Sequence, residues 1–211
     1  MTDDSTRIWT PANIVTLTRI LLIPIFVAAL LSPWPNWLPE PEFWAMWQPW
    51  IAAAVFIIIS ATDAIDGHLA RSRDEITDLG KFLDPLADKI LVCAALLALV
   101  ELQTFPSWVA LIIIAREFIV SGLRMVAAAQ GKVIAASMFG KFKTVLQICA
   151  ILLFTVKDSL QISLMGDGFA MCFTIFSWIV LLGAVIMTIV SMVDYFYKSR
   201  EVLGFGKRTD R

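Results

Sequence analysis

The sequence predicts an all-α integral membrane protein with six transmembrane helices and both termini in the cytoplasm. Its 211 residues are 59% hydrophobic and 17% charged, which is more apolar surface than one soluble core of this length can bury. Six apolar stretches are close to the roughly 20 residues that cross about 30 Å of hydrocarbon. The Lys and Arg residues, 17 in number, are unevenly distributed between the connecting segments, which indicates the topology.

The six predicted spans follow one another within a single domain. They cover approximately residues 11–31, 50–70, 83–102, 107–128, 142–156 and 170–195. The first begins at Thr10 and Pro11, a typical helix start because proline fits the first turn. The fifth is the shortest. We therefore expect a short cytoplasmic segment at 1–10, the six-helix domain at 11–197, and a basic cytoplasmic tail at 198–211.

The positive charges predict the orientation of these spans. Only Lys157 falls on one side of the six-span arrangement, and twelve cations fall on the other: Arg7, Arg71, Arg73, Lys81, Lys132, Lys141, Lys143, Lys198, Arg200, Lys207, Arg208 and Arg211. The positive-inside rule assigns the second side to the cytoplasm, and the Trp-rich segment 32–50 becomes an external loop. Asp3 and Asp4 replace a basic n-region, so no cleaved leader is expected.

Other bulk features predict little chemistry. Cys93, Cys149 and Cys172 lie in apolar spans without metal-ligand spacing, so we expect them to pack. The formal net charge of -1 indicates no particular partner, and we expect no nucleic acid among the partners.

Four aspartates in the second and third spans are the most informative residues. A charged side chain at the centre of a span costs at least about 2.5–3.5 kcal/mol, so it needs a partner or a purpose. Asp63 and Asp66 are three residues apart, and Asp84 and Asp88 are four apart, so each pair shares one helix face. Asp63 lies 13 residues beyond the start of its span, about 20 Å along the helix. The polar turn 72–81 then forms a hairpin, and we expect the four carboxylates to converge near the cytoplasmic side.

Divalent metal is the expected partner of this cluster. Neighbouring carboxylates cannot all remain ionised without cations, because like charges raise one another's pKa values. Oxygen ligands without His or Cys select Mg²⁺, Mn²⁺ or Ca²⁺, and the number of carboxylates suits one or two Mg²⁺ ions, with Mn²⁺ as an alternative. The structural alternative is ion pairing with Arg71, Arg73, Lys81 or Lys89.

The residues around the aspartates carry a resemblance to a known family. The segment reads Asp63-Ala-Ile-Asp66-Gly67-His-Leu-Ala70-Arg71, then eight residues, then Gly80-Lys-Phe-Leu-Asp84-Pro-Leu-Ala-Asp88. It resembles the complete motif of the CDP-alcohol phosphotransferases, with every fixed position present. The resemblance implies an enzyme that displaces CMP from a CDP-linked donor with an alcohol. It also implies six transmembrane helices, a site open to the cytoplasm and bilayer, and usually a homodimer.

The resemblance divides the work among the motif residues. Asp63, Asp66 and Asp84 are similar to ligands of a dinuclear Mg²⁺ site, and Asp88 to the aspartate that deprotonates the alcohol and also touches a metal. The positions that resemble contacts to the CDP-linked donor are Gly67, Ala70, Arg71 and Thr77. Their structural alternatives are helix packing and an arginine that reaches the membrane surface. His68 occupies a variable position of the motif and is interpreted as incidental.

The first span adds three polar residues to the predicted donor site. Asn13, Thr16 and Arg19 recur at three-residue spacing and would face the same nucleotide from the cytoplasmic end of their helix. The alternative, helix capping together with an Arg19 that extends to the membrane surface, stays open.

The fourth and fifth spans predict the acceptor site. Arg116 lies well inside its span and needs an anion, and Glu117 is only a partial partner because adjacent helical residues point about 100° apart. Arg116 and Lys141 are predicted to hold a phosphate of the acceptor, with Arg124 or Lys143 nearer the surface. Lys141 and Lys143 point to nearly opposite faces, so only one is expected to take part. Contacts to lipid headgroups or pairing between helices are the alternatives.

The acceptor segments narrow the resemblance. Along roughly residues 11–150, the chain is similar to bacterial family members that join CDP-diacylglycerol to glycerol 3-phosphate, which implies the bacterial inner membrane. Beyond Ala150 only the hydropathy is similar. Alternatives within the family use phosphatidylglycerol or an inositol phosphate as the acceptor. Outside the family, the alternatives are an intramembrane prenyltransferase and a divalent cation transporter, although the chain lacks the repeated halves of many transporters.

Overall fold

The computed structural model describes residues 11–31, 42–73, 78–131 and 138–200. These parts of the chain form seven α-helices and no strand, so the all-α prediction is confirmed for them. In chain order they are α1 (Pro11–Leu31), α2 (Glu42–Arg73), α3 (Asp78–Glu101), α4 (Ser107–Ala129), α5 (Met138–Val156), α6 (Leu160–Leu164) and α7 (Asp167–Ser199). All except the five-residue α6 are at least 19 residues long.

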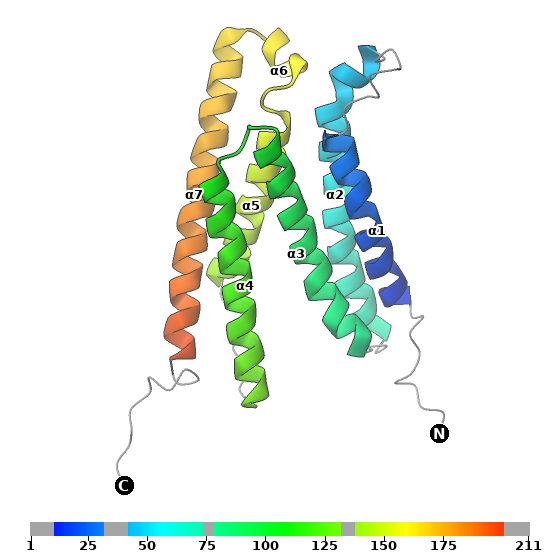
Figure 1. Cartoon of the computed structure of the whole chain (residues 1–211), viewed down its shortest axis with the longest axis vertical. Coiled ribbons are helices and arrows are strands. Elements are labelled where there is room, and N and C mark those ends of the chain that lie inside the picture. Colours follow the sequence, from blue (N-terminus) through cyan, green and yellow to red (C-terminus); the bar gives the residue numbers. More distant parts are fainter. Residues whose placement is uncertain (1–10, 32–41, 74–77, 132–137, 201–211) are drawn as a thin grey trace.

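The six long helices alternate in direction along the bundle (Figure 1). The first turn of α1 and the last turn of α7 lie at the same end, together with the end of α2 and the start of α3. The short connection from α3 to α4 lies at the opposite end, as does α6. We call the end that holds the first turn of α1 the motif end, because α2 ends there and α3 begins there.

The bundle consists of two groups of helices that meet along α3. In the first group α1 packs on both α2 and α3, and in the second α7 packs on both α4 and α5. Contacts of α3 with α4 and α5, and of α2 with α5, join the groups. The ring centroids of Phe26 and Phe56 lie 5.4 Å apart in the first group, and those of Phe154 and Trp178 lie 5.3 Å apart in the second. Such aromatic pairs stabilise a core beyond the area that they bury.

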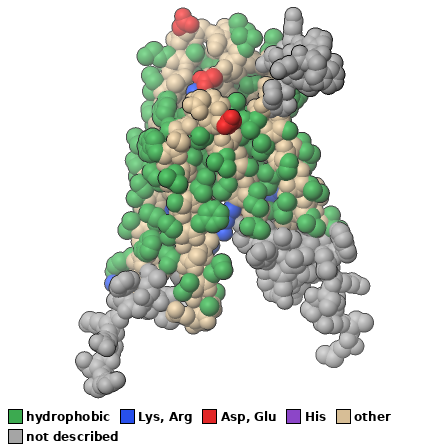
Figure 2. Space-filling model, in the orientation of Figure 1, with side chains coloured by type: hydrophobic (Ala, Val, Ile, Leu, Met, Phe, Trp, Pro, Cys, Tyr) green, Lys and Arg blue, Asp and Glu red, His purple; other side chains and the backbone are tan. Residues whose placement is uncertain are grey.

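The outer surface of the bundle is apolar. Many large side chains point outward, among them Leu21, Leu111 and Met125, each at least 67% exposed. A soluble protein rarely exposes so much apolar surface, and Figure 2 shows that hydrophobic side chains cover most of the visible face. The protein is therefore membrane-embedded as well as all-α.

Three described helices, α1, α5 and α7, are long and apolar enough to cross a membrane, over Ile14–Leu31, Met138–Val156 and Asp167–Ser199. A shorter apolar stretch of α2 covers Met46–Thr62. Charged residues such as Lys89 on α3 and Arg116 on α4 lower the hydropathy of the helices that carry them. The count of six spans stays a prediction.

The helices extend beyond the predicted spans. The segment 42–50, predicted as part of an external loop, is the first part of α2, so that part of the prediction is wrong. The spans were delimited by hydropathy, whereas a helix continues wherever its backbone hydrogen bonds extend it at little cost. For the same reason α5 begins four residues early and α7 extends past both predicted ends. The short helix α6 was not predicted.

The cysteines differ from one another in exposure. All three are free thiols, with Cys93 half-buried and Cys149 and Cys172 exposed. Packing inside the bundle therefore describes Cys93, and it is wrong for the other two because they lie on the outward faces of α5 and α7.

Candidate active site

A charged cavity of about 310 Å³ lies among α3, α4, α5 and α7. Its lining residues are Asp88, Lys89, Arg116, Glu117, Val120, Ser121, Arg124, Gly140, Lys141, Thr144 and Tyr195. Four of these are cations and two are carboxylates, so the lining carries an excess of positive charge. Inside an apolar bundle this excess favours an anionic ligand. We call this space the cationic cavity.

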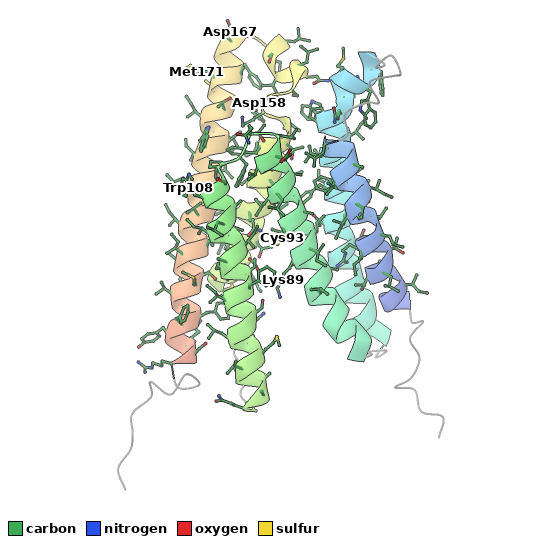
Figure 3. All side chains as sticks on the ribbon, in the orientation of Figure 1. Lys89, Cys93, Trp108, Asp158, Asp167 and Met171 are labelled. Carbon is green, nitrogen blue, oxygen red and sulfur yellow. The ribbon has the colours of Figure 1, made fainter. Side chains whose placement is uncertain are left out.

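A second cavity of about 130 Å³ adjoins the first and extends to α2. Both are lined by Asp88, Lys89, Glu117 and Thr144, and the smaller one also reaches Phe56 and Ser60. Ser60 lies one helical turn before Asp63 in the sequence. Figure 3 shows Lys89 on α3, toward α4 and one turn from Cys93. The two cavities thus connect the aspartate-bearing helices with the cationic ones.

Arg116 is held in the interior by partners on two helices. Its side chain is only 7% exposed. Nη1 donates to Oε1 of Glu117 at 3.3 Å, and Nη2 donates to Oγ of Ser191 on α7 at 2.5 Å. The Nε atom is buried without a hydrogen-bond partner in the described part of the protein. Glu117 thus accepts a hydrogen bond from only one nitrogen of Arg116, so it is the partial partner that the sequence predicted.

The two lysines of α5 have different surroundings. Lys143 is 3% exposed and forms an ion pair with Oε1 of Glu117, the same atom that contacts Arg116. It lines the smaller cavity, whereas the exposed Lys141 lines the cationic cavity. Of the two lysines of α5, Lys141 therefore shares the cavity with Arg116, a choice that the sequence left open. A Lys143 nearer the surface is wrong, because its side chain is buried. The binding of a phosphate by Lys141 stays a prediction.

An aromatic ring from α7 lies beside both arginines of α4. The guanidinium carbons of Arg116 and Arg124 are 5.7 Å and 5.4 Å from the ring centroid of Tyr195. The ring itself is 4% exposed and lines the cationic cavity. Arginine is attracted to an aromatic face at such distances. α7 therefore contributes to a site that the sequence analysis assigned to the fourth and fifth spans.

The aspartate segment is helical as predicted. Asp63, Asp66, Gly67, Ala70 and Arg71 lie in α2 and Asp84 lies in α3, but their side chains are outside the described part. Thr77 lies outside the described residues altogether. Asp88 is described, is exposed, and lines both cavities. The described side chains contain no group of three His, Cys, Asp or Glu that could hold a metal, so the predicted ligand set stays a prediction.

Two of the three polar residues that the sequence selected on α1 are deeply buried. Thr16 is fully buried and Arg19 is 1% exposed, while the side chain of Asn13 is outside the described part. An Arg19 that extends to the membrane surface is therefore wrong, because its side chain is enclosed in the bundle, in which α1 packs against both α2 and α3. A contact of these residues with the nucleotide stays a prediction.

The sequence did not select Lys89, Glu117 or Tyr195, which line the cationic cavity, or Ser191, which bonds to Arg116. Lys89 and Glu117 were considered only as partners of other charges. Ser191 and Tyr195 are four residues apart in a mostly apolar helix, so they share one face. This spacing was the available signal, but the surrounding hydropathy indicated nothing more than a membrane span.

The fold and site define a class: a helical, membrane-embedded protein in which the helices that carry the aspartates adjoin a cationic cavity. Residues 9–190 match the profile of the family described as CDP-alcohol phosphatidyltransferase. The chain belongs to this family, so the predicted resemblance is confirmed. The match extends well beyond Ala150, where the sequence analysis found similarity in hydropathy alone.

Bacterial relatives resemble the chain over most of its length. The CDP-diacylglycerol–glycerol-3-phosphate 3-phosphatidyltransferase of Bacillus subtilis is 43% identical over 192 residues, which cover 90% of this chain and 95% of the relative. The protein of the same name from Haemophilus influenzae is 37% identical over 189 residues, 86% of this chain and 88% of the relative. A probable phosphatidylglycerophosphate synthase of Mycobacterium tuberculosis is 33% identical over 203 residues, 96% of this chain and 88% of the relative.

Proposed function

We propose that the protein transfers the phosphatidyl group of CDP-diacylglycerol to glycerol 3-phosphate, which gives phosphatidylglycerophosphate and CMP in anionic phospholipid synthesis. The observation that carries this proposal is the cationic cavity, where Arg116, Arg124 and Lys141 lie around a space that Asp88 also lines. A phosphate-bearing alcohol matches both features, an anion for the cations and a hydroxyl for the carboxylate. The names of the relatives support the same donor and acceptor.

Arg116 provides the sharpest support for a phosphate ligand. Its guanidinium carries five N–H groups, of which Glu117 and Ser191 accept two. Because Arg116 lines the cavity, donors remain for the oxygens of a bound phosphate. Lys141 and Arg124 supply further positive charge from the exposed side of the cavity. The volume of about 310 Å³ suits a small phosphate ester.

Asp88 is the proposed general base. With the phosphate held by Arg116 and Lys141, the acceptor hydroxyl lies within the cavity that Asp88 lines. The carboxylate takes the proton of the acceptor hydroxyl. The hydroxyl oxygen bonds to the phosphorus of the phosphatidyl group, and the bond from this phosphorus to CMP breaks. A positioned base of this kind typically contributes about 10²–10⁴-fold to the rate.

A divalent metal site belongs to the proposal. α2 and α3 are helical through all four aspartates, so each pair occupies one face, and a donor set of carboxylates alone suits Mg²⁺ or Mn²⁺. Asp63, Asp66, Asp84 and Asp88 would hold two such ions. When bound, they neutralise the charge of the diphosphate and of the leaving CMP.

The donor's nucleotide has its own proposed contacts beside the metal site. The helix α2 supplies the small residues Gly67 and Ala70, which allow close approach to the backbone, and Arg71 as a cation. Thr77 and three residues of α1 complete the set: Asn13, Thr16 and Arg19. The burial of Thr16 and Arg19 supports an inward-facing role.

The proposed membrane setting is a bacterial inner membrane crossed six times, with the active site and both termini on the cytoplasmic side and a homodimer as the assembly. Support comes from the charges at the two ends. Lys198 and Arg200 lie where α7 ends, at the motif end, whereas the described residues at the opposite end include a single cation, Lys157 after α5. The positive-inside rule then assigns the motif end to the cytoplasm.

A donor and acceptor assay on the purified protein tests the proposed reaction. The protein would be incubated with CDP-diacylglycerol, Mg²⁺ and labelled glycerol 3-phosphate, and the lipid product identified by mass spectrometry. We expect phosphatidylglycerophosphate and an equal amount of CMP, with no product when the donor is omitted. Product from phosphatidylglycerol or an inositol phosphate, but none from glycerol 3-phosphate, would contradict the proposed acceptor.

A further inference from the structure

Two buried polar residues of α7 contact the arginines of the cationic cavity from across the helix interface. Ser191 is fully buried and Tyr195 is 4% exposed, and the spacing of four residues places them on one face of α7. Ser191 accepts the 2.5 Å hydrogen bond of Arg116, and the Tyr195 ring lies beside both Arg116 and Arg124. Both residues follow position 190, where the family match ends.

These contacts restrain how Arg116 faces the cavity. A guanidinium is planar and rigid, and the Nη1 and Nη2 atoms of Arg116 are bonded to Glu117 and Ser191. Two fixed corners of a rigid plane determine the orientation of the whole group. Because a guanidinium carries five N–H groups, the oriented arginine keeps donors for a ligand in the cavity that it lines.

Tyr195 keeps two like charges near the same cavity. Arg116 and Arg124 are eight residues apart on α4, a separation of about 12 Å along the axis. Two cations in an apolar environment repel each other, and the negative face of an aromatic ring offsets this by attracting both. The ring therefore favours an arrangement in which both guanidinium groups remain beside the cavity.

We propose that Ser191 and Tyr195 are positioning residues that orient Arg116 and Arg124 and thereby set the affinity for the phosphate of the acceptor. The inference rests on the proposed function, because it takes the cationic cavity as the acceptor site. In this role, α7 supplies the side chains that fix the orientation of the two arginines of α4. Its effect is confined to the acceptor, since neither residue lies on α1, α2 or α3.

Substitutions of Tyr195 test this role through the two substrates separately. We expect Tyr195→Leu to raise the KM for glycerol 3-phosphate about tenfold and to leave the KM for CDP-diacylglycerol unchanged. Tyr195→Phe keeps the ring and is expected to stay within about twofold of the wild type. The matched control is Tyr197→Leu, which removes a 65% exposed ring that lies 4.6 Å from Arg200. This control is expected to change neither KM.

A substitution of Ser191 tests the hydrogen bond with a smaller change. We expect Ser191→Ala to raise the KM for glycerol 3-phosphate about fivefold. Inorganic phosphate, used as a competitive inhibitor, should need about fivefold more to inhibit. The control is Ser177→Ala, because Ser177 is an equally buried serine of α7 whose hydroxyl donates only to the carbonyl of Phe173.

The outcomes separate this inference from the proposed function. A wild-type protein without turnover on glycerol 3-phosphate contradicts the proposed function. A fully active wild type whose Ser191→Ala and Tyr195→Leu variants keep its KM for glycerol 3-phosphate overturns the inference alone. An equal rise of both KM values, or a fall in Tm with unchanged phosphate inhibition, also overturns it, since a packing role acts that way. If Tyr195→Leu does not fold, Ser191→Ala, which removes one oxygen, decides.

Discussion

The two groups of helices carry their functional residues in different ways. In the group of α1, α2 and α3, the four aspartates fall within one short segment, 63–88, and each of the two pairs has helical spacing. In the group of α4, α5 and α7, the cavity residues extend from Arg116 to Tyr195 and come from three helices. The first arrangement depends on the pitch of a helix, and the second depends on how helices pack. A local motif can therefore indicate a metal site, whereas a phosphate cavity becomes visible only in three dimensions.

The comparison predicts that the first group serves the donor and its metal, and the second group serves the acceptor. Removal of divalent metal should have the largest effect. Treatment with EDTA is expected to reduce turnover by at least about 10³-fold, because without cations the four carboxylates and the diphosphate repel one another. Mg²⁺ or Mn²⁺ should restore turnover in the labelled-acceptor assay.

The control for metal removal is the acceptor site itself. Binding of inorganic phosphate, measured by calorimetry, should change little in EDTA, because Arg116, Arg124 and Lys141 supply its positive charge. Full turnover after exhaustive chelation would contradict the metal site.

Asp88 lies where the two groups meet, so its substitution should be nearly as severe. Asp88→Asn is expected to lower kcat about 10³-fold while much of the binding of CDP-diacylglycerol remains, because the amide cannot accept the proton of the hydroxyl. Single-turnover kinetics and donor titration would separate the two effects. Asp158→Asn, at the opposite end of the bundle, is the control. Unaltered turnover of Asp88→Asn would exclude its role as the base.

Arg116 should affect the acceptor more than the donor. Arg116→Ala is expected to lower kcat/KM for glycerol 3-phosphate about 10²-fold, since it removes a charged, buried hydrogen-bond donor. Arg116→Lys should recover only part of this loss, because lysine lacks the planar fork that spans Glu117 and Ser191. Steady-state kinetics with each substrate varied in turn gives the comparison. An equal loss of kcat/KM for both substrates would contradict the assignment of the donor to the first group and the acceptor to the second.

The two lysines of α5 should give the smallest and most contrasting effects on activity. Lys141→Ala is expected to raise the KM for glycerol 3-phosphate about fivefold with an unchanged Tm, because its side chain is exposed at the cavity. Lys143→Ala should instead lower the Tm, because Glu117 loses a buried partner. Thermal unfolding in detergent and KM determination would be run on both variants. A lower Tm for Lys141→Ala and a higher KM for Lys143→Ala would assign the acceptor contact to Lys143 instead of Lys141.

Much of the helical framework of the first group was predictable because its signals are local. Apolar runs indicated the helices, and the intervals between Asp63, Asp66, Asp84 and Asp88 indicated shared faces at the end where α2 and α3 meet. Arg116 was predictable too, since a cation within an apolar span requires a partner. The helix ends were less accurate, because hydropathy stops at the membrane interface while backbone hydrogen bonding does not.

By itself, the sequence determined that the protein is an all-α membrane protein of the CDP-alcohol phosphatidyltransferase family, because composition and a fixed motif depend only on neighbouring residues. The tertiary structure alone decided that Lys143 pairs with Glu117 while Lys141 lines the cavity, that Arg19 is buried, and that α7 reaches Arg116 and Arg124. The physical reason is the separation along the chain. Arg116 and Ser191 are 75 residues apart, so their contact depends on the packing of α4 against α7, which no local pattern encodes.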